Sequence, residues 1–193
     1  MELASGPAVL RRFQPGDAER LAQHANSRAI WLNLRDLFPH PYSVEDAERY
    51  IEATHAQAPV TSFAIAVEGR AVGGMSLRPG NDIERLTAEL GYWLGEAFWG
   101  RGIVSAGVVS ITEYAFAVLG LLRVFAVPFV RNPASARVLE KAGYVREAVM
   151  RCSAVKEGEL LDQYLYAAVR PAGGRARGLS ADGTGEEHLI RGR

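Results

Sequence analysis

The stretch from 89 to 105 constrains the fold of this chain more than any other segment. It reads as an apolar strand, Leu90–Leu94, then a loop with two glycines, Gly100 and Gly102, then the start of a long apolar helix. The first N–H groups of a helix have no partner within it, and the helix dipole adds partial positive charge there. Because glycine lets a phosphate approach the backbone closely, this order predicts a site for a phosphorylated ligand.

Two common phosphate-binding motifs do not match this loop. The segment Gly100-Arg101-Gly102-Ile103-Val104-Ser105 lacks the third glycine of a dinucleotide-binding motif. A nucleotide-triphosphate loop would end in Gly-Lys-Ser/Thr, which is absent. A tight strand-to-helix connection that binds nothing is the alternative interpretation of Gly-x-Gly on its own.

Composition excludes several classes of function. The 193 residues fit one domain, 48% of them are hydrophobic, and Lys+Arg and Asp+Glu both number 22. Without a long basic run, nucleic-acid binding has no electrostatic support. The sequence has no uninterrupted apolar stretch of about 18 residues, so no membrane-spanning helix is expected. The four histidines are scattered without metal-ligand spacing, so no metal is expected. With one cysteine and no signal-peptide pattern at the start, we expect a cytoplasmic protein.

The remaining segments predict a mixed α/β (α+β) domain without internal repeats. Strands are expected over 9–13, 63–67, 71–77, 87–94, 124–127, 144–153 and 160–169, and helices over 18–26, 44–56, 103–119 and 133–142. Residues 28–42 are expected to be irregular. Residues 171–193 contain seven Pro or Gly and few large apolar side chains, so we expect a disordered tail after a domain over 1–170.

Capping residues predict where three of the helices begin. Asp17 is expected to cap the first of them. Ser43 followed by Asp46 three residues later predicts a capping box for the second. Asn132 before Pro133 predicts the start of the last helix, because Asn is a favoured cap and Pro is tolerated at the first helical position.

Three phrases in this order and spacing resemble the GNAT superfamily of acyl-CoA-dependent N-acetyltransferases, and more narrowly its RimJ/RimL-type branch. The phrases are Ala88-Glu-Leu-Gly-Tyr-Trp-Leu94, Phe98-Trp-Gly-Arg-Gly102 and Asn132-Pro-Ala-Ser-Ala-Arg-Val-Leu-Glu-Lys-Ala-Gly-Tyr144. The resemblance covers about residues 8–170. It implies a mostly antiparallel sheet flanked by helices, in which the fourth and fifth strands, about 87–95 and 123–128, splay apart.

The resemblance implies acetyl-CoA as the co-substrate. The backbone of Trp93 and Leu94 would pair with the pantetheine, and Asn132 would also bond it. The pyrophosphate would be held by backbone N–H groups from Trp99, Gly100, Arg101, Gly102, Ile103, Val104 and Ser105. The sequence departs from the superfamily at both ends of the loop motif, where Trp99 and Val104 stand, and Ala106 replaces the glutamate that the branch often carries.

The resemblance also implies catalytic residues, for which alternatives stay open. Glu89 matches the general base, because amine acetylation needs a neutral amine; it is otherwise a solvent-facing or ion-paired strand residue. Ser135 matches the acid that protonates the thiolate; it is otherwise a polar residue in the first turn of a helix. Tyr92 and Tyr144 are alternative acids.

The acceptor is expected over the N-terminal helices, with an aromatic wall made by Trp31, Phe38, His40 and Tyr42. These side chains could instead pack the helices against the sheet. The reaction expected first is acetylation of a protein N-terminal α-amine. Acetylation of a small-molecule amine, a non-catalytic acetyl-CoA-binding module, and a homodimeric assembly all stay open.

Overall fold

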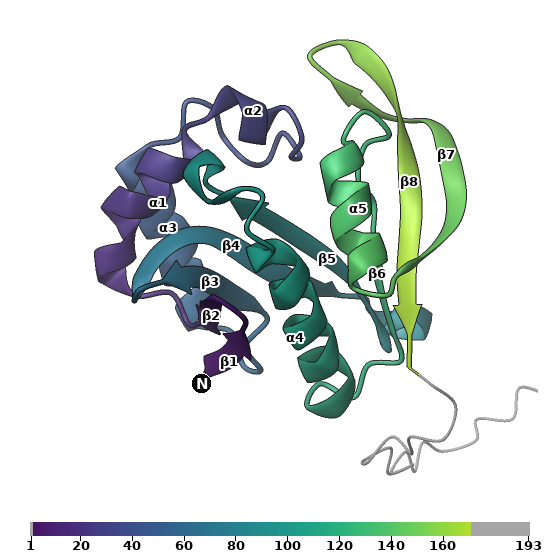
Figure 1. The fold of residues 1–193 in the computed structure, drawn as a ribbon, viewed down its shortest axis with the longest axis horizontal. Helices are drawn as coiled ribbons and strands as arrows, with labels where there is room; N and C mark the ends of the chain where they lie inside the picture. The colour runs from purple at the N-terminus through teal and green to yellow at the C-terminus, as the bar shows by residue number, and fades with distance from the viewer. Residues whose placement is uncertain (1, 171–193) are drawn as a thin grey trace, which may run out of the picture.

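The computed structural model describes residues 2–170, and the tail expected over 171–193 lies outside them. One sheet contains eight strands in the order β1-β2-β3-β4-β5-β6-β8-β7 (Figure 1). Their bounds are β1 Glu2–Ser5, β2 Ala8–Arg11, β3 Ser62–Val67, β4 Arg70–Pro79, β5 Thr87–Leu94, β6 Arg123–Ala126, β7 Val145–Lys156 and β8 Glu159–Val169. Neighbours are antiparallel except β5 and β6, which are parallel. The predicted fold class is therefore confirmed.

Helices cover both faces of this sheet (Figure 1). The α-helices are α1 Ala18–Ala25, α2 Arg28–Trp31, α3 Val44–His55, α4 Ile103–Ala117 and α5 Pro133–Lys141, and short 3-10 turns are η1 Pro15–Asp17, η2 Asp82–Glu84 and η3 Glu96–Phe98. Helices α1 and α3 pack on one face, while α4 and α5 pack on the other. Parts of the sheet are thus buried on both sides, which explains the nearly continuous apolar runs of β3 and β4.

Two apolar clusters fill the spaces between the helices and the sheet. Phe63 and Ile65 of β3 join Ile111 of α4 in one cluster. Ala64, between them in sequence, belongs to the other cluster with Leu21 of α1. This alternation follows from the two-residue period of a strand. Burying large apolar side chains contributes about 1.5–3 kcal/mol each, so these clusters fix the sheet to its helices.

Two of the predicted helix starts are confirmed in detail. The Ser43 hydroxyl accepts from the Asp46 N–H at 3.1 Å, and the Asp46 carboxylate accepts from the Ser43 N–H at 2.9 Å. Asn132 caps α5, since its Oδ1 accepts from the Ser135 N–H at 3.1 Å. Asp17 stands at the N-cap position of α1 as predicted, but its side chain does not cap the helix: its buried carboxylate pairs with Arg11 at 2.7 and 2.8 Å and makes no cap bond to α1.

One strand and one α-helix were not expected from the sequence. Strand β1 forms a hairpin with β2 around Gly6, although its residues carry no clear alternation. The stretch expected to be irregular contains α2, which Ser27 caps by accepting from the Ile30 N–H at 3.3 Å. A helix of one turn lies below the length at which periodicity is informative.

Candidate active site

Strands β5 and β6 diverge after a short parallel contact. Thr87–Glu89 pairs with Arg123–Phe125, and β6 then continues beside β8, while β5 stays paired with β4 as far as Leu94. The backbone from Gly91 to Leu94 therefore has no strand on its β6 side. Free backbone N–H and C=O groups need partners, so this splay is a place where an extended ligand can pair with β5. The predicted splay between these two strands is present.

The glycine loop follows directly from β5. Gly100 and Gly102 have φ of 75° and 74°, in the left-handed region that favours glycine, and Gly102 is the cap residue of α4. A side chain built on either glycine would meet no atom within 4 Å. The glycines thus turn the chain and leave open space above the helix. The N–H groups of Ile103, Val104 and Ser105 begin α4 there, where an anion is favoured.

Trp99 has a structural role in this loop. Its indole Nε1–H donates to the carbonyl of Leu94 at 2.7 Å, which ties the loop to the end of β5. Arg101 donates to the Ala97 carbonyl at 2.8 Å, so it holds the preceding turn. Val104, the bulky departure from the superfamily motif, packs its side chain against the core. The loop geometry therefore fits a phosphate cradle made of backbone groups.

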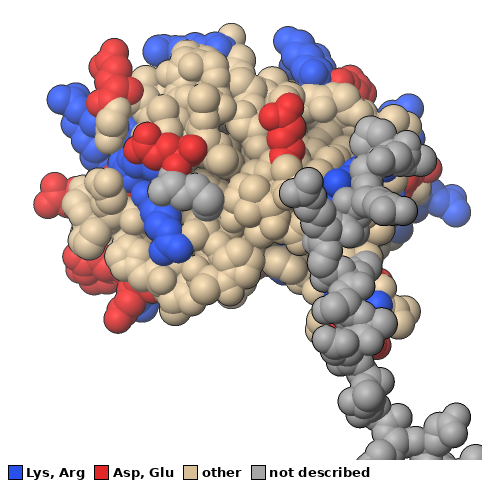
Figure 2. All heavy atoms as spheres, turned by 90° about the horizontal axis from the view of Figure 1, so that it is seen from below, with Lys and Arg blue, Asp and Glu red and all other residues tan. Residues whose placement is uncertain are grey.

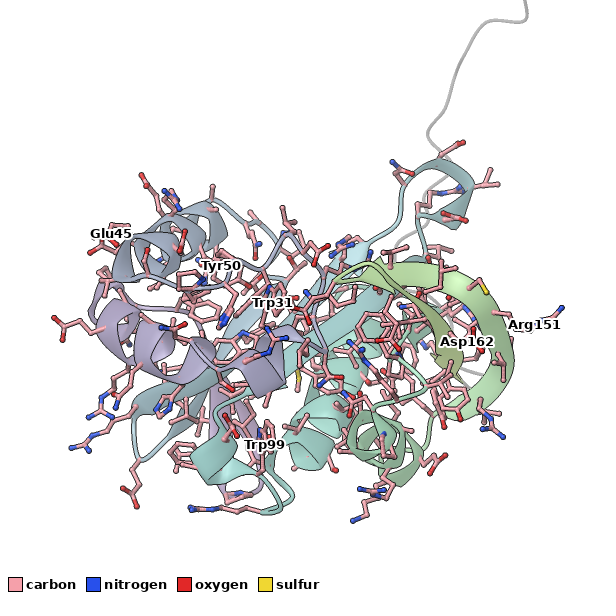
Figure 3. The ribbon with its side chains drawn as sticks, turned by 90° about the horizontal axis from the view of Figure 1, so that it is seen from above. Trp31, Glu45, Tyr50, Trp99, Arg151 and Asp162 are labelled. Carbon is pink, nitrogen blue, oxygen red and sulfur yellow. The ribbon has the colours of Figure 1, made fainter. Side chains whose placement is uncertain are left out.

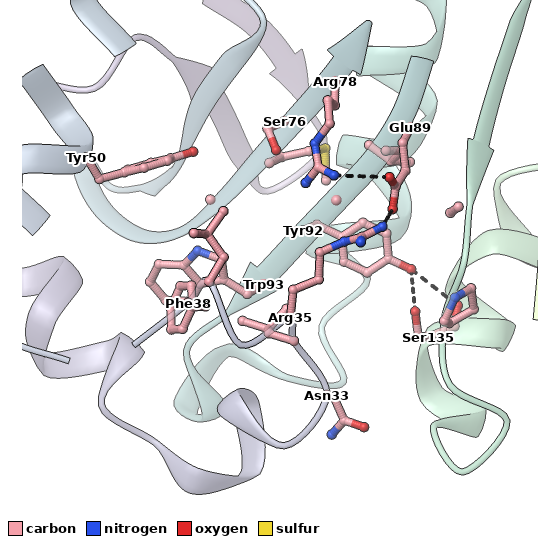
Figure 4. A pocket seen from close by; sticks show the side chains of 18 of the residues that line it. Asn33, Arg35, Phe38, Tyr50, Ser76, Arg78, Glu89, Tyr92, Trp93 and Ser135 are labelled. Carbon is pink, nitrogen blue, oxygen red and sulfur yellow. Dashed lines mark hydrogen bonds and ion pairs between the residues drawn. The ribbon is translucent and has the colours of Figure 1, made fainter. Parts of the chain in front are cut away.

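A pair of hydroxyl groups spans the splay. Tyr92 of β5 has its hydroxyl 2.7 Å from the Ser135 hydroxyl of α5 (Figure 4). Burial raises the pKa of Tyr92, so its hydroxyl stays protonated at neutral pH. Asn132, which caps the same helix, lies one turn before Ser135. The helix start and the strand together place a protonated donor where the two strands separate.

Tyr144, the other alternative acid, lies elsewhere. Its ring is buried in the core, and its hydroxyl is 2.7 Å from the Thr112 hydroxyl of α4. Burial raises the pKa of Tyr144 to about 12. It does not line the cavity described below, so we assign it to packing.

Glu89 forms ion pairs with two arginines. Its side chain is 17% exposed, and its carboxylate accepts from Arg35 at 2.5 Å and from Arg78 at 3.4 Å (Figure 4). Arg78 lies directly opposite Glu89 in the β4–β5 register, whereas Arg35 comes from the loop after α2. The ion-paired state is thus the one that the structure holds, and a bound ammonium group would compete with these guanidinium groups for the same carboxylate.

These groups share one cavity of about 590 Å³. Glu89, Tyr92 and Ser135 lie in its wall (Figure 4). It extends from the splay across β4 and β5 to α3, a size that suits a small ligand or a few residues of an extended peptide. The cavity therefore joins the splay to the face where an acceptor is expected.

The four aromatic residues expected in the acceptor wall divide into two pairs. Phe38 and Tyr42 line the cavity, stacked with ring centres 4.7 Å apart. Trp31 and His40 do not line it; they stack on each other at 5.2 Å. Trp31 instead lies under the buried ammonium of Lys156, 3.7 Å from the ring centre, between the N-terminal helices and the β7–β8 hairpin (Figure 3). These two side chains therefore pack outside the cavity and do not line it.

Sequence reasoning missed the two arginines of the cavity that pair with Glu89, Arg35 and Arg78. Arg78 follows from the β4–β5 register, which the length of the intervening loop leaves open in the sequence. Arg35 lies in a stretch without periodicity, so no pattern pointed to it. Trp93, expected only as a backbone partner of the cofactor, also lines the cavity with its side chain, whose ring lies 5.7 Å from that of Phe38.

Residues 2–170 contain no group of three or more His, Cys, Asp or Glu that could hold a metal ion. None of the described helices is long and apolar enough to cross a membrane. On the face seen from below, acidic and basic side chains are interspersed rather than gathered into one basic patch (Figure 2).

Comparison with known proteins agrees with this geometry. Residues 8–145 match the family model described as an acetyltransferase (GNAT) domain. The putative ribosomal N-acetyltransferase YdaF of Bacillus subtilis is 28% identical over 170 residues, which cover 84% of this chain and 91% of YdaF. The ribosomal-protein-serine acetyltransferase of Escherichia coli is 31% identical over 133 residues, covering 66% and 72%. The uncharacterised N-acetyltransferase YoaA of Bacillus subtilis is 37% identical over 84 residues, covering 44% of this chain and about half, 48%, of YoaA.

Solved structures show the same fold. The structure of RimL, a ribosomal L7/L12 α-N-protein acetyltransferase in complex with coenzyme A, superposes with a TM-score of 0.76. It is 21% identical, and the match covers 88% of this chain and 98% of that one.

Proposed function

Because the chain belongs to the GNAT acetyltransferase family, in its RimJ/RimL-type branch, we propose that it transfers the acetyl group of acetyl-CoA to a protein N-terminal α-amine. Membership of this family is sufficient to identify the chain as an acyltransferase, and the fold of the family binds acetyl-CoA. The α-amine is our proposal, and the names of YdaF and of the Escherichia coli relative support a ribosomal acceptor. We further propose that residues 1–170 form the catalytic domain and that it acts in the cytoplasm.

The residues at the splay suit this co-substrate. The open, left-handed glycines leave the N-terminus of α4 accessible, so the N–H groups from Trp99 to Ser105 would hold the pyrophosphate. Asn132 would hold the pantetheine together with the backbone of β5 at Trp93 and Leu94, where no strand covers the β6 side and Trp99 binds the Leu94 carbonyl. Acetyl-CoA, when bound, supplies the activated acetyl thioester.

Two groups of this chain would handle the protons of the reaction. An amine at neutral pH carries a proton that must leave before its lone pair can react. Glu89 would take it, directly or through water, because its carboxylate faces the cavity next to the splay. The Tyr92–Ser135 hydroxyl pair would hold the proton that the leaving thiol needs, since burial keeps Tyr92 protonated.

The observation that carries this proposal is the single cavity that contains Glu89, Tyr92 and Ser135 beside the splay. Holding reactants in line with such groups is itself a large rate effect. A release assay for free thiol, run with N-terminal peptides and with small amines, tests it. Release with peptides supports the proposal, release only with small amines replaces the acceptor, and no release with any amine leaves a binding module.

A further inference from the structure

The cavity holds more positive than negative charge. Three arginines line it, Arg35, Arg49 and Arg78, against two carboxylates, Asp46 and Glu89. Arg49 pairs with Asp46 one turn away on α3, so those two charges balance. Arg35 and Arg78, in contrast, share the single carboxylate of Glu89. This group of three side chains keeps one uncompensated positive charge.

The two guanidinium groups of this trio are only partly used. Each makes one hydrogen bond to Glu89, and neither has another hydrogen-bond partner among residues 2–170. A guanidinium carries five N–H donors in a planar fork, which suits a second carboxylate. Both side chains are more than half exposed, 57% for Arg35 and 62% for Arg78, so the remaining donors can meet a ligand.

The positions of the two arginines also limit what that ligand is. They come from opposite sides of Glu89, one from the loop after α2 and one from β4 (Figure 4). An acceptor whose amine faces Glu89 can therefore reach the two arginines with a group that is only a few covalent bonds away from that amine. Phe38 and Trp93 wall the cavity further on, which leaves apolar room for the rest of the molecule.

We propose that Arg35 and Arg78 form a carboxylate subsite, so that the acceptor is an amine with a carboxylate close to it. This inference rests on the proposed function and names its substrate class. The carboxylate can be an Asp or Glu side chain near a peptide N-terminus, or the α-carboxylate of a free amino acid. The acceptor's ammonium group faces Glu89 while its carboxylate takes the open donors of the two arginines.

A simpler role for the arginines makes a different prediction. If they only hold Glu89 in place, replacing them slows the reaction of every acceptor by the same factor. If they bind the acceptor's carboxylate, replacing them removes the preference for acidic acceptors over neutral ones of the same shape. The ratio of kcat/KM for two matched acceptors separates these roles.

The kinetic test uses amidated peptides that begin Ser-Asp or Ser-Asn, and in a second arm serine against serinamide. The peptide arm reports a side-chain carboxylate and the other arm reports a free α-carboxylate. In one arm we expect the acidic member to be favoured by about tenfold or more, mostly through KM, as for a charge-assisted hydrogen bond. Arg35→Gln and Arg78→Gln should each bring that ratio toward one. A kcat/KM ratio near one in both arms with the unchanged protein overturns the proposal. A preference for the acidic acceptor that survives in the double variant overturns it as well.

Two further measurements keep the outcome decisive. Arg151→Gln is the matched control, because Arg151 projects from the far edge of β7 (Figure 3), does not line the cavity and should leave the ratio unchanged. Binding of the acetylated products, N-acetyl-Ser-Asp-amide against N-acetyl-Ser-Asn-amide, is measured by calorimetry with coenzyme A present and needs no turnover. Tighter binding of the Asp product that disappears in the double variant supports the subsite even if no acceptor is acetylated. Equal binding, or none at millimolar concentration, contradicts it.

Discussion

The hydroxyl of Tyr92 lies 2.7 Å from the hydroxyl of Ser135, and this contact joins β5 to α5 where β5 and β6 separate. The two residues are far apart in sequence, and the parallel pairing of β5 with β6, which α5 follows in the chain, brings them together. A strand residue with a raised pKa thus supports a hydroxyl in the first turn of a helix. We expect the pair to act as one proton donor.

Removing either hydroxyl should therefore slow turnover without weakening the binding of acetyl-CoA. Ser135→Ala and Tyr92→Phe should each lower kcat by about tenfold or more, because a positioned acid contributes directly to the rate of the step in which it gives up its proton. Because the two hydroxyls contact each other, the double variant should lose less than the product of the single losses. Tyr144→Phe is the control: it removes a core hydroxyl and should cost about 1 kcal/mol of stability with kcat unchanged.

Glu89→Gln should reduce turnover by about 10²–10⁴, because glutamine cannot take a proton from the amine. Acetyl-CoA should still raise the melting temperature, since the glycine loop is unchanged. Glu84→Gln, at an exposed position in η2, provides the control. Wild-type turnover in the Glu89 variant on a true acceptor would leave the residue a purely ion-paired one.

Gly102 and Gly120 allow a matched test of the phosphate cradle. Both have a left-handed φ, 74° and 69°, and a side chain on either would meet no atom within 4 Å. Gly102→Leu and Gly120→Leu should thus lose similar stability, about 1–2 kcal/mol from the backbone conformation. Only Gly102→Leu should abolish the thermal shift produced by acetyl-CoA. Equal shifts in both variants would place the pyrophosphate elsewhere.

A buried ammonium group, that of Lys156, links the end of β7 to the segment that contains Trp31 and Asp36. Lys156 is 1% exposed, 2.7 Å from Asp36 and above the ring of Trp31. Asp36→Asn should lower the free energy of unfolding by about 1 kcal/mol or more, because a buried charge loses its partner. Glu157→Gln, which breaks the exposed pair with Arg28, should change it by less than about 0.5 kcal/mol. Chemical denaturation of both variants checks the difference.

His24 should make stability depend on pH. Burial, helped by the nearby Arg20, lowers the pKa of His24 below its ordinary 6.5, and its Nε2 is buried with no partner in the described structure. Between the two pKa values the unfolded chain binds more protons than the folded one, so stability rises with pH. The free energy of unfolding should fall as the pH drops below about 6.5, and His24→Gln should flatten that slope. An identical slope in the variant would contradict this.

Much of the fold followed from local patterns in the sequence. The capping box at Ser43, the cap at Asn132 and the glycine loop are short-range features, and the structure contains each of them. Asp17 shows the limit, since Arg11 binds its carboxylate from a neighbouring strand and takes it from the helix it precedes. Local propensity does not report such a competition between partners.

The candidate site was less accessible to sequence reasoning. Motifs pointed to Glu89 and Ser135, but the partners of these residues depend on tertiary contacts. The sheet register sets Arg78 against Glu89, and an irregular loop brings Arg35 to the same carboxylate. Trp31 likewise looked like an acceptor residue because it is aromatic, whereas the β7–β8 hairpin recruits its ring for Lys156.

The most direct test of the proposed function is to locate the acetyl group that the enzyme transfers. A peptide with one N-terminal α-amine and one internal lysine is incubated with acetyl-CoA and sequenced by tandem mass spectrometry, with Glu89→Gln alongside. We predict acetylation of the α-amine by the unchanged protein and a large loss in the variant. If no peptide and no small amine is acetylated while acetyl-CoA still raises the melting temperature, the chain binds the co-substrate without catalysing transfer, and the account is wrong.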